Sequence, residues 1–472
     1  MVGRRSSCRI LTSLGLSVFL LMVIIGVALY IPAGFGFHSV TLPIPHPNKD
    51  PPKFHQPPSH QQNQDDQGQT KQNHHPKVPH ERPSEDVGTW KYDPKRDGRR
   101  NGLSYAQCNS AFSGMYKDLE SSVSHRRSIG DVTEEDVDLE WKKTGAVRAM
   151  IYDQKLHILE TKFSSSGYDQ ERALAVLHSL DRAVTSSPEP IPNVEFGFSV
   201  SDIADKSHSH HTIWALSRLV KDEKTWLMPD FGYWSWPLEL VGGYEEIRAE
   251  ISENEPPWGN KVAKLLWRGS AKTNSVRADL LRVSKGKIWA DVHDVQWKNR
   301  TDVGEEESPV AIPEHCDYQF LIQTEGRSYS GRGKYLLNCR SVVFIHKQEW
   351  IEPHHALLVS FGPDQNFVEV ERNFSDLEVK VEELLKDPDR ASKIAENSVA
   401  TFRDRYLTPA AQACYWRQLL RSWADVSFDP QGWEILNGRK KVRGVPFETF
   451  AIQTVMPTKN DCPFWKKLFN KC

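Results

Sequence analysis

The sequence predicts an α/β protein in which two doubly wound domains follow a membrane anchor and a disordered stem. Strand-like segments alternate with helical segments in both halves of residues 98–428. Two prolines, Pro256 and Pro257, separate the halves, and a long apolar run lies near the N-terminus. At 472 residues the chain is long enough for two such domains. The predicted parts are a cytosolic tail at 1–9, an anchor at 10–31, a stem at 32–97, domains at 98–255 and 256–428, and an extension at 429–472.

The apolar run over residues 10–31 contains no Lys, Arg, Asp or Glu, and Arg9 directly precedes it. A bilayer needs about 20 apolar residues, whereas the apolar core of a cleaved signal peptide has about 7–15. Because arginines precede the run, we expect a cytosolic N-terminus and a single-pass type II anchor. Residues 32–97 are rich in Pro, Gln and His. They bury too little apolar area to fold and are expected to form an extended stem.

Six of the seven cysteines and two N-glycosylation acceptors lie beyond the anchor and fit a lumenal, oxidising placement. Cys8 lies on the cytosolic side and is a candidate for palmitoylation. The six remaining cysteines, whose pairing the sequence leaves open, are Cys108, Cys316, Cys339, Cys414, Cys462 and Cys472. The acceptors are Asn299 in Asn-Arg-Thr and Asn373 in Asn-Phe-Ser. The net charge of −2 gives no overall basic surface for nucleic acid.

Residue periodicity predicts the elements of the first domain. They are paired strands over 145–160, a helix over 170–183, a strand over 194–200, a loop over 226–237 and a short helix over 245–250. The turn of the strand pair falls at Asp153 and Gln154. Asp202 follows the 194–200 strand, at the end where α/β sheets place their ligands.

The second domain is predicted in the same way. Its elements are a strand over 264–267, a helix carrying Arg277, a strand over 318–322, a helix starting at Lys334, a strand over 342–345, and helices over 395–406 and 409–423. Thr408 and Pro409 are the residue types that cap and begin the last helix.

A glycine-rich turn between the 318–322 strand and the Lys334 helix organises this domain. Three glycines allow a ligand to approach the backbone closely, and Arg327, Arg332 and Lys334 place cations in the same turn. A helix start adds free N–H groups, so the turn suits a phosphate or diphosphate. The spacing is neither that of a Walker loop nor G-x-G-x-x-G. The alternative is a surface turn whose arginines are solvated.

The residues around this turn carry a family resemblance. H-C-x-Y-x-F-L-x-x-x-x-G, then Arg332, then K-Y-L-L-x-C-x-S-V-V-F resembles the central signature of the CAP10-like glycosyltransferases, glycosyltransferase family 90. The likeness spans about residues 140–425. It implies the GT-B architecture, with two Rossmann-like domains facing a cleft. It further implies inverting transfer of xylose or glucose from a UDP-sugar to a hydroxyl of a glycan or glycoprotein in the secretory pathway. The chain lacks the retention tail of the family's soluble glucosyltransferases, which favours the Golgi membrane over the endoplasmic reticulum.

The resemblance also implies the donor site. Arg332 would clamp the diphosphate, and the other donor contacts would be Ser270, Arg277, Arg327, Ser328, Tyr329, Ser330, Gly331 and Arg268. The match at Arg277 needs one extra residue after Ser270, and a structural salt bridge is an equal alternative for Arg268. In the family the two signature cysteines pair, which implies a Cys316–Cys339 disulfide. Cys108–Cys414 and Cys462–Cys472 would then remain.

Asp202 is the candidate catalytic base, because a carboxylate at the acceptor hydroxyl can take its proton. Asp205 lies close enough in sequence to compete, although it fits a helix cap better. Trp234, Ser235 and Trp236 are candidates for acceptor binding, with core packing as the alternative for the tryptophans.

No metal site is expected. His208, His210 and His211 lie close together, but no D-x-D pattern supports them. The arginine clamp makes a divalent ion unnecessary, so metal-independent transfer without a cofactor is predicted.

Two other functions remain open. The first is a membrane-anchored glycan-binding protein that kept the fold and lost turnover, which would lack the base or the clamp. The second is a glycoside hydrolase, which needs two acids flanking one bond, a pairing that nothing in the sequence supplies.

Overall fold

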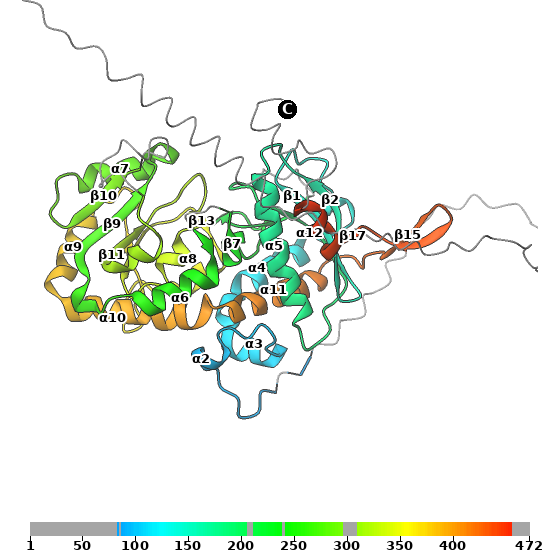
Figure 1. Ribbon diagram of the computed structural model, residues 1–472, viewed down its shortest axis with the longest axis horizontal. Helices are drawn as coiled ribbons and strands as arrows, with labels where there is room; N and C mark the ends of the chain where they lie inside the picture. The colour runs from blue at the N-terminus through cyan, green and yellow to red at the C-terminus, as the bar shows by residue number, and fades with distance from the viewer. Residues whose placement is uncertain (1–82, 85, 205–210, 238–240, 296–308, 456–472) are drawn as a thin grey trace, which may run out of the picture. The chain divides into compact units, whose positions relative to one another are not determined.

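The computed structural model describes residues 83–84, 86–204, 211–237, 241–295 and 309–455 (Figure 1). The predicted tail, the anchor and most of the stem lie outside these residues. So do Asp205, His208, His210, Asn299, Cys8, Cys462 and Cys472. Within the described ranges, no helix combines the length and the apolar character that a bilayer crossing requires.

The C-terminal sheet has five strands in the order β10-β9-β11-β12-β14, and every pairing in it is parallel. The strands are β9 (Val262–Gly269), β10 (Ala290–Asp294), β11 (Tyr318–Gln323), β12 (Val342–His346) and β14 (Val368–Val370). Counted along the chain this order is 2-1-3-4-5, so the direction of winding reverses between β9 and β11. In such sheets the crevice beyond the strand ends at the reversal is the usual ligand site.

Helices cover both faces of this sheet, as predicted for a doubly wound domain. Alternate strand residues, such as Trp267 and Leu266, enter two different apolar clusters. The helices of the first cluster are α7 (Ser275–Ser284), α9 (Leu377–Lys386) and α10 (Pro388–Ser398). Those of the second are α6 (Tyr244–Asn254) and the short α8 (Gly333–Leu336).

The N-terminal sheet differs from the prediction of a second doubly wound domain, because it is mixed. Its order is β17-β2-β1-β3-β4-β6, and only β3-β4-β6 are parallel. The strands are β1 (Ala146–Tyr152), β2 (Lys155–Lys162), β3 (Val194–Ser199), β4 (Trp214–Ala215), β6 (Trp226–Leu227) and β17 (Val445–Pro446). Asp153 and Gln154 have φ of 48° and 62°, the conformation of a tight hairpin turn, so β1 and β2 must be antiparallel.

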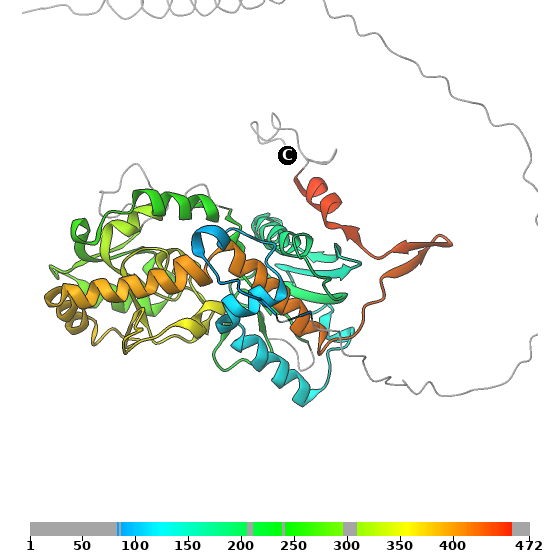
Figure 2. The same ribbon diagram turned by 90° about the horizontal axis from the view of Figure 1, so that it is seen from below.

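Helices from distant parts of the chain pack on this sheet in one large apolar cluster. They are α3 (Tyr105–Phe112), α4 (Lys117–Ile129), α5 (Tyr168–Thr185), α11 (Pro409–Ala424) and α12 (Phe447–Val455). Thr408 caps α11 through its side chain and Pro409 begins the helix, as predicted. Figure 2 shows α10, η9 (Val399–Tyr406) and α11 following one another from the C-terminal sheet to the N-terminal sheet.

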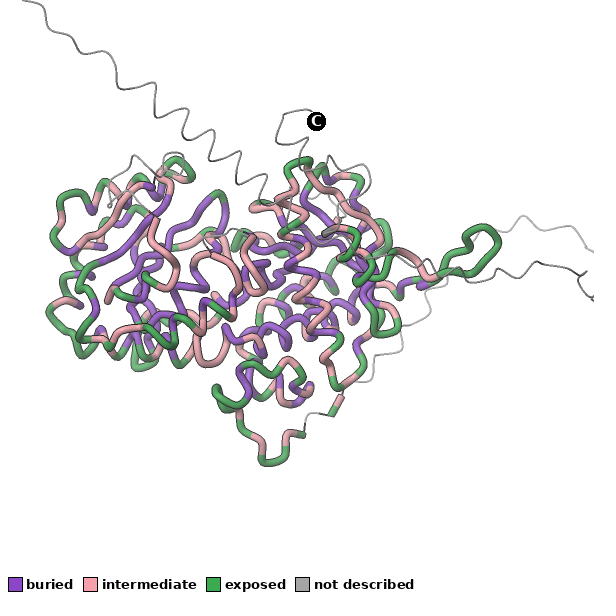
Figure 3. The backbone as a smooth tube through the Cα atoms, in the orientation of Figure 1, coloured by how far each residue is buried: buried purple, intermediate pink, exposed green. Residues whose placement is uncertain are grey.

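Three boundaries therefore change. The first domain does not run to residue 255, because α6 packs with the C-terminal sheet. The second domain does not run to residue 428, because α11 packs with the N-terminal sheet and Cys414 bonds Cys108 of α3. The predicted extension contributes β17 to that sheet's edge, while the hairpin of β15 (Trp433–Leu436) and β16 (Arg439–Val442) projects outward with its first strand exposed (Figure 3).

The first domain also includes residues before 98. Asp93 caps the short helix α2 (Pro94–Asp97), which follows Trp90 and Tyr92 packed on the N-terminal core. Asp97 is fully buried, and hydrogen bonds led by that from Arg96 lower its pKa to about 2. This part of the predicted stem is structured because two aromatic rings give it apolar surface to bury.

Candidate functional site

A cavity of about 300 Å³ lies where β9 and β11 end, at the reversal of the C-terminal sheet. Its lining residues are of two kinds, named here the polar wall and the apolar wall. The polar lining consists of Arg268, Ser270, Thr273, Arg277, His315, Ser330 and Arg332. The apolar lining includes Trp236, Val241, Val295, Pro309, Val310, Ile312 and Tyr335. A ligand with one charged and one uncharged part fits this division.

Two arginines of the polar wall lack a carboxylate partner among the described residues. Arg277 donates to the carbonyl oxygens of Glu325 at 2.9 Å and Ser270 at 3.2 Å. Arg332 donates to the carbonyl oxygen of Arg268. Both guanidinium groups lie beside the ring of Trp267, at 5.8 and 5.9 Å from its centroid. Carbonyl oxygens and an aromatic face orient a guanidinium, but they do not neutralise it.

The pKa values of these arginines are lowered, as expected for buried positive charges without a carboxylate partner. Burial, together with the charge of Arg277, lowers the pKa of Arg332 to about 9. Burial lowers the pKa of Arg277 to about 10. Both groups are still protonated at neutral pH, so the cavity holds two positive charges that repel each other. An anion with at least two negative charges would neutralise them, and a diphosphate meets this condition.

A buried ion pair between Lys334 and Asp230 stabilises the glycine-rich turn. Lys334 Nζ lies 2.9 Å from Asp230 Oδ1, and the Tyr329 hydroxyl donates to Asp230 Oδ2 at 2.5 Å. Lys334 was expected to add a cation to the phosphate site, and this was wrong because Asp230 already neutralises it. A Cβ on Gly331 would lie 2.5 Å from the ring of Trp236, so only glycine fits there.

The disulfide implied by the resemblance is present between Cys316 and Cys339. It ties η7 (Pro313–Asp317), which carries His315, to the chain just after α8. The disulfide therefore links the segment that carries His315 to the segment that follows α8 and precedes β12.

Arg268 forms the structural salt bridge that the sequence left open as an alternative to donor binding, and it also lies at the cavity. Its guanidinium forms a salt bridge with Asp291 at 2.7 Å, and its side chain also lines the cavity. Ser270 lines the same cavity directly after β9.

Asp202 lies in a second cavity of about 420 Å³, together with Arg172 and Arg327. Arg172 Nη1 donates to its Oδ1 at 2.8 Å, and the Asp202 side chain is 44% exposed. The hydroxyl of Ser328 donates to the carbonyl oxygen of Asp202. The turn thus contacts both cavities, with Arg327 in one and Arg332 in the other, although the structure does not bring Asp202 and Arg332 into one cavity.

The three predicted acceptor residues separate. Trp236 lines the first cavity, whereas Trp234 stacks on His178 at 5.1 Å and lies under the guanidinium of Arg182 at 4.0 Å. Ser235 belongs to β7 (Ser235–Trp236), which pairs with β8 (Gly242–Gly243). The predicted loop over 226–237 therefore contains β6, η3 (Phe231–Tyr233) and β7.

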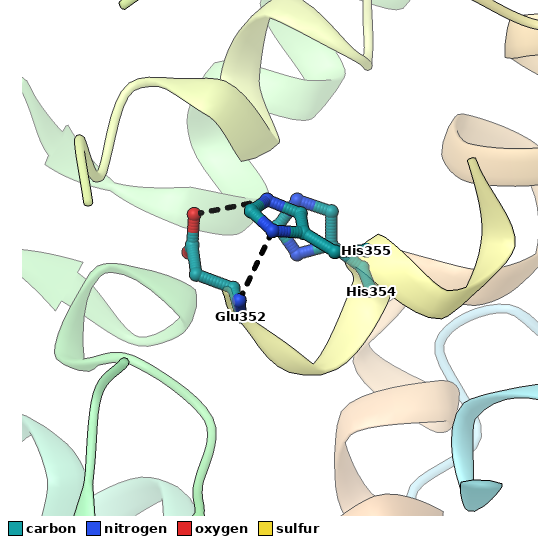
Figure 4. A group of neighbouring side chains, drawn as sticks. All are labelled: Glu352, His354 and His355. Atoms are coloured by element: carbon teal, nitrogen blue, oxygen red, sulfur yellow. Dashed lines mark hydrogen bonds and ion pairs between the residues drawn. The ribbon is translucent and has the colours of Figure 1, made fainter. Parts of the chain in front are cut away.

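One cluster of described residues has the side chains of a metal site: Glu352, His354 and His355, at the start of η8 (Pro353–Leu357) (Figure 4). The backbone N–H of Glu352 donates to His355 Nδ1 at 3.2 Å, which places the imidazole proton on Nε2. That nitrogen faces Glu352 Oε2 at 3.6 Å. A metal bound at Nε2 would force the imidazole proton of His355 onto Nδ1. That proton would then face the backbone N–H of Glu352, which is also a donor. The contacts instead form a capping box.

Burial accounts for the protonation of this cluster. It raises the pKa of Glu352 well above its usual value and lowers that of His355 to about 3. His355 is therefore neutral at pH 7, and because the contacts are those of a helix cap we assign the cluster to the fold rather than to chemistry.

Asn373 is exposed in a turn, which is accessible for glycosylation. His211, considered with the metal-like histidines, is hydrogen-bonded to Asp138 at 2.8 Å.

Sequence reasoning missed four functional positions: Trp267, His315, Asp230 and Arg172. Trp267 and His315 are neighbours in sequence of predicted site residues, Arg268 and Cys316, which was a usable signal. Asp230 and Arg172 act through partners far away in the chain, and no local pattern reports such pairs.

The fold and the cavity define an α/β protein with an arginine-lined cavity at the reversal of a parallel sheet. The model of the family described as Glycosyl transferase family 90 matches residues 104–434, and the chain belongs to this family. The resemblance found in the sequence is thereby confirmed.

Named relatives match a shorter part of the chain. The O-glucosyltransferase rumi homolog of Aedes aegypti is 29% identical over 217 residues, 42% of this chain and 52% of that protein. Protein O-glucosyltransferase 1 of Rattus norvegicus is 27% identical over 219 residues, 42% of this chain and 53% of that protein. The chain spans about half the length of the curated relatives it matches.

Proposed function

We propose that this protein is an inverting glycosyltransferase that moves a sugar from a UDP-sugar to a hydroxyl of a glycan or glycoprotein. The observation that carries the proposal is the pair of unneutralised arginines, Arg277 and Arg332, at the ligand end of a parallel sheet. The family and the names of the relatives support glycosyl transfer. Glucose or xylose is the proposed sugar, and the GT-B architecture is part of the same proposal.

In the proposed reaction the bond between the sugar's anomeric carbon and the diphosphate oxygen breaks. The diphosphate leaves with the electron pair, and Arg277 and Arg332 neutralise the charge that develops on it. Two guanidinium groups supply this stabilisation without a divalent ion, so the proposal includes no metal and no cofactor.

Asp202 is the proposed base. It takes the proton of the acceptor hydroxyl while that oxygen attacks the anomeric carbon from the face opposite the diphosphate, which inverts the configuration. Arg172 holds the carboxylate in one orientation. The turn from Arg327 to Arg332 spans both cavities, so the transferred sugar would lie along it, between clamp and base.

The proposed location is the Golgi membrane, in a single-pass type II orientation through residues 10–31. The apolar run after three arginines supports the anchor, and two disulfides support an oxidising lumen.

The test is incubation of the full chain in detergent with a panel of UDP-sugars, following both UDP binding and sugar release, with and without a chelator. We expect binding and turnover of UDP-glucose or UDP-xylose, unaffected by the chelator. Arg332→Ala should abolish binding, whereas Asp202→Asn should bind the donor and lose transfer. Binding of no UDP-sugar contradicts the proposal. Binding without any turnover would leave a glycan-binding protein of the same fold.

A further inference from the structure

His315 lines the first cavity and has one ring nitrogen that the fold does not use. The residue is buried, lies on η7 beside the Cys316–Cys339 disulfide, and lines the cavity together with Arg332. Its Nε2 is buried and has no hydrogen-bond partner among the described residues. Buried polar atoms without a partner are rare in folded proteins, and one in a side chain that lines a ligand cavity points to a missing ligand group.

The other ring nitrogen determines what that ligand group must be. His315 Nδ1 lies 2.9 Å from the carbonyl oxygen of Ala311, and a carbonyl oxygen only accepts, so Nδ1 carries the proton. Burial and the charge of Arg332 lower the pKa of His315 to about 4, so the ring is neutral at pH 7. Nε2 then offers a lone pair and no proton. It can accept from an O–H or N–H group, and it cannot bind a phosphate oxygen.

The apolar wall indicates which part of the donor reaches this atom. Ile312 lies three residues before His315, and both line the cavity with Val310 and Val295. Asp202 and Arg327 lie in the other cavity, at the opposite end of the turn from Arg332. The transferred sugar must extend toward Asp202, so the nucleoside is the part left on the His315 side of the diphosphate.

We propose that His315 is a specificity-determining residue whose Nε2 accepts a hydrogen bond from the nucleoside of the donor. The donating group is either a ribose hydroxyl or the imide N–H of the uracil ring. This inference rests on the proposed function, because it takes the ligand to be a UDP-sugar. Two other lining residues have unpartnered buried nitrogen atoms, Trp236 Nε1 and Arg268 Nε. Both are donors and restrict the ligand less, since every phosphate and carbonyl oxygen accepts.

The experiment compares UDP, 2′-deoxy-UDP, 3′-deoxy-UDP, N3-methyl-UDP and inorganic diphosphate by calorimetry, on the full chain and on His315→Phe and His315→Gln. Phenylalanine keeps a planar ring and removes the acceptor, whereas glutamine can offer an amide oxygen. We expect one analogue to bind the unaltered protein about tenfold more weakly than UDP, in line with one lost hydrogen bond. His315→Phe should bind UDP and that analogue equally, and His315→Gln should restore part of the difference.

The outcomes are separable. Discrimination against a deoxy analogue identifies the ribose, and discrimination against N3-methyl-UDP identifies the base. If His315→Phe keeps the discrimination, or weakens inorganic diphosphate as much as UDP, the inference is overturned. Failure of the unaltered protein to bind UDP would instead refute the proposed function.

A second measurement does not depend on the folding of the variants. In the unaltered protein, the ¹⁵N resonance of His315 Nε2 should move on addition of UDP and stay unchanged with inorganic diphosphate. An equal response to both ligands contradicts the inference.

Discussion

The two cavities differ in how their buried arginines are paired. In the cavity of Asp202, Arg172 is paired at 2.8 Å, and the carboxylate holds the pKa of Arg172 above its usual value against the effect of burial. In the cavity at the sheet reversal, Arg268 has a carboxylate partner, but Arg277 and Arg332 have none among the described residues. Burial lowers the pKa values of both Arg277 and Arg332.

The difference shows how charge identifies a ligand site. A paired arginine is already neutralised, so it positions its partner and has little attraction left for an anion. Two unpaired arginines that repel each other destabilise the empty protein and are compensated only when an anion binds. The site is therefore expected to gain binding at the expense of stability, a common property of functional sites.

The largest expected effect is that of Arg332→Gln. Removing the buried charge should weaken UDP binding on the order of 100-fold or more, the range for losing a charge-assisted contact. The free energy of unfolding of the ligand-free protein should stay unchanged or rise by about 1 kcal/mol, because the repulsion from Arg277 is gone. Calorimetry with UDP and urea unfolding without it measure the two quantities.

Arg282→Gln is the matched control for that variant. Arg282 lies on α7, the same helix as Arg277, but its side chain is 66% exposed and pairs with Asp279 at 2.9 Å. Neither UDP affinity nor stability should change by more than about 0.5 kcal/mol. A destabilised Arg332→Gln protein would contradict the claim that the unpaired charge is a cost to the fold.

A smaller effect is expected from Arg172→Gln, which breaks the paired side of the comparison. UDP affinity should remain within about twofold, since the paired guanidinium is not available to the diphosphate. Turnover of the UDP-sugar should fall by roughly tenfold, because Asp202 loses the group that orients it. Steady-state rates measure the turnover, and UDP titrations measure the affinity. A large loss of UDP affinity would show that Arg172 binds the donor.

The sequence allowed prediction of the elements that are long and periodic. The strands β11 and β12, the helix α5 and the cap of α11 all have local signals and were confirmed. The mixed order of the N-terminal sheet was not predictable in this way. Its strands β4, β6 and β17 contain two residues each, too few for an alternation to be recognised, and β17 arrives from the far end of the chain.

The candidate site shows the same limit. The positions of Arg277 and Arg332 follow from local motif order, and the structure brings them to one cavity. Whether a cation is free depends on partners elsewhere in the fold, such as Asp230 for Lys334. In the sequence the three cations of the turn look equivalent. The His315 tautomer likewise depends on a carbonyl oxygen whose position only the folded chain defines.

Arg268→Gln tests pairing independently of location, because Arg268 lines the first cavity and yet is paired with Asp291. UDP affinity should fall by only about threefold. Stability at pH 7 should fall by about 2 kcal/mol, since the partly buried Asp291 loses a partner and keeps the Tyr318 hydroxyl at 2.5 Å. Burial acts to raise the pKa of Asp291, but hydrogen bonds from Tyr318 and Arg268 hold it below its usual value.

The sign of the pH dependence follows from that lowered pKa. A carboxyl group with a depressed pKa in the folded state contributes stability above its unfolded pKa, near 3.9, and loses it as the pH falls through the folded value. The stability difference between Arg268→Gln and the unaltered protein should therefore be full at pH 7 and shrink below about pH 4. Urea unfolding at both pH values measures it. A loss of UDP affinity as large as that of Arg332→Gln would mean that a paired guanidinium binds the anion as well as an unpaired one.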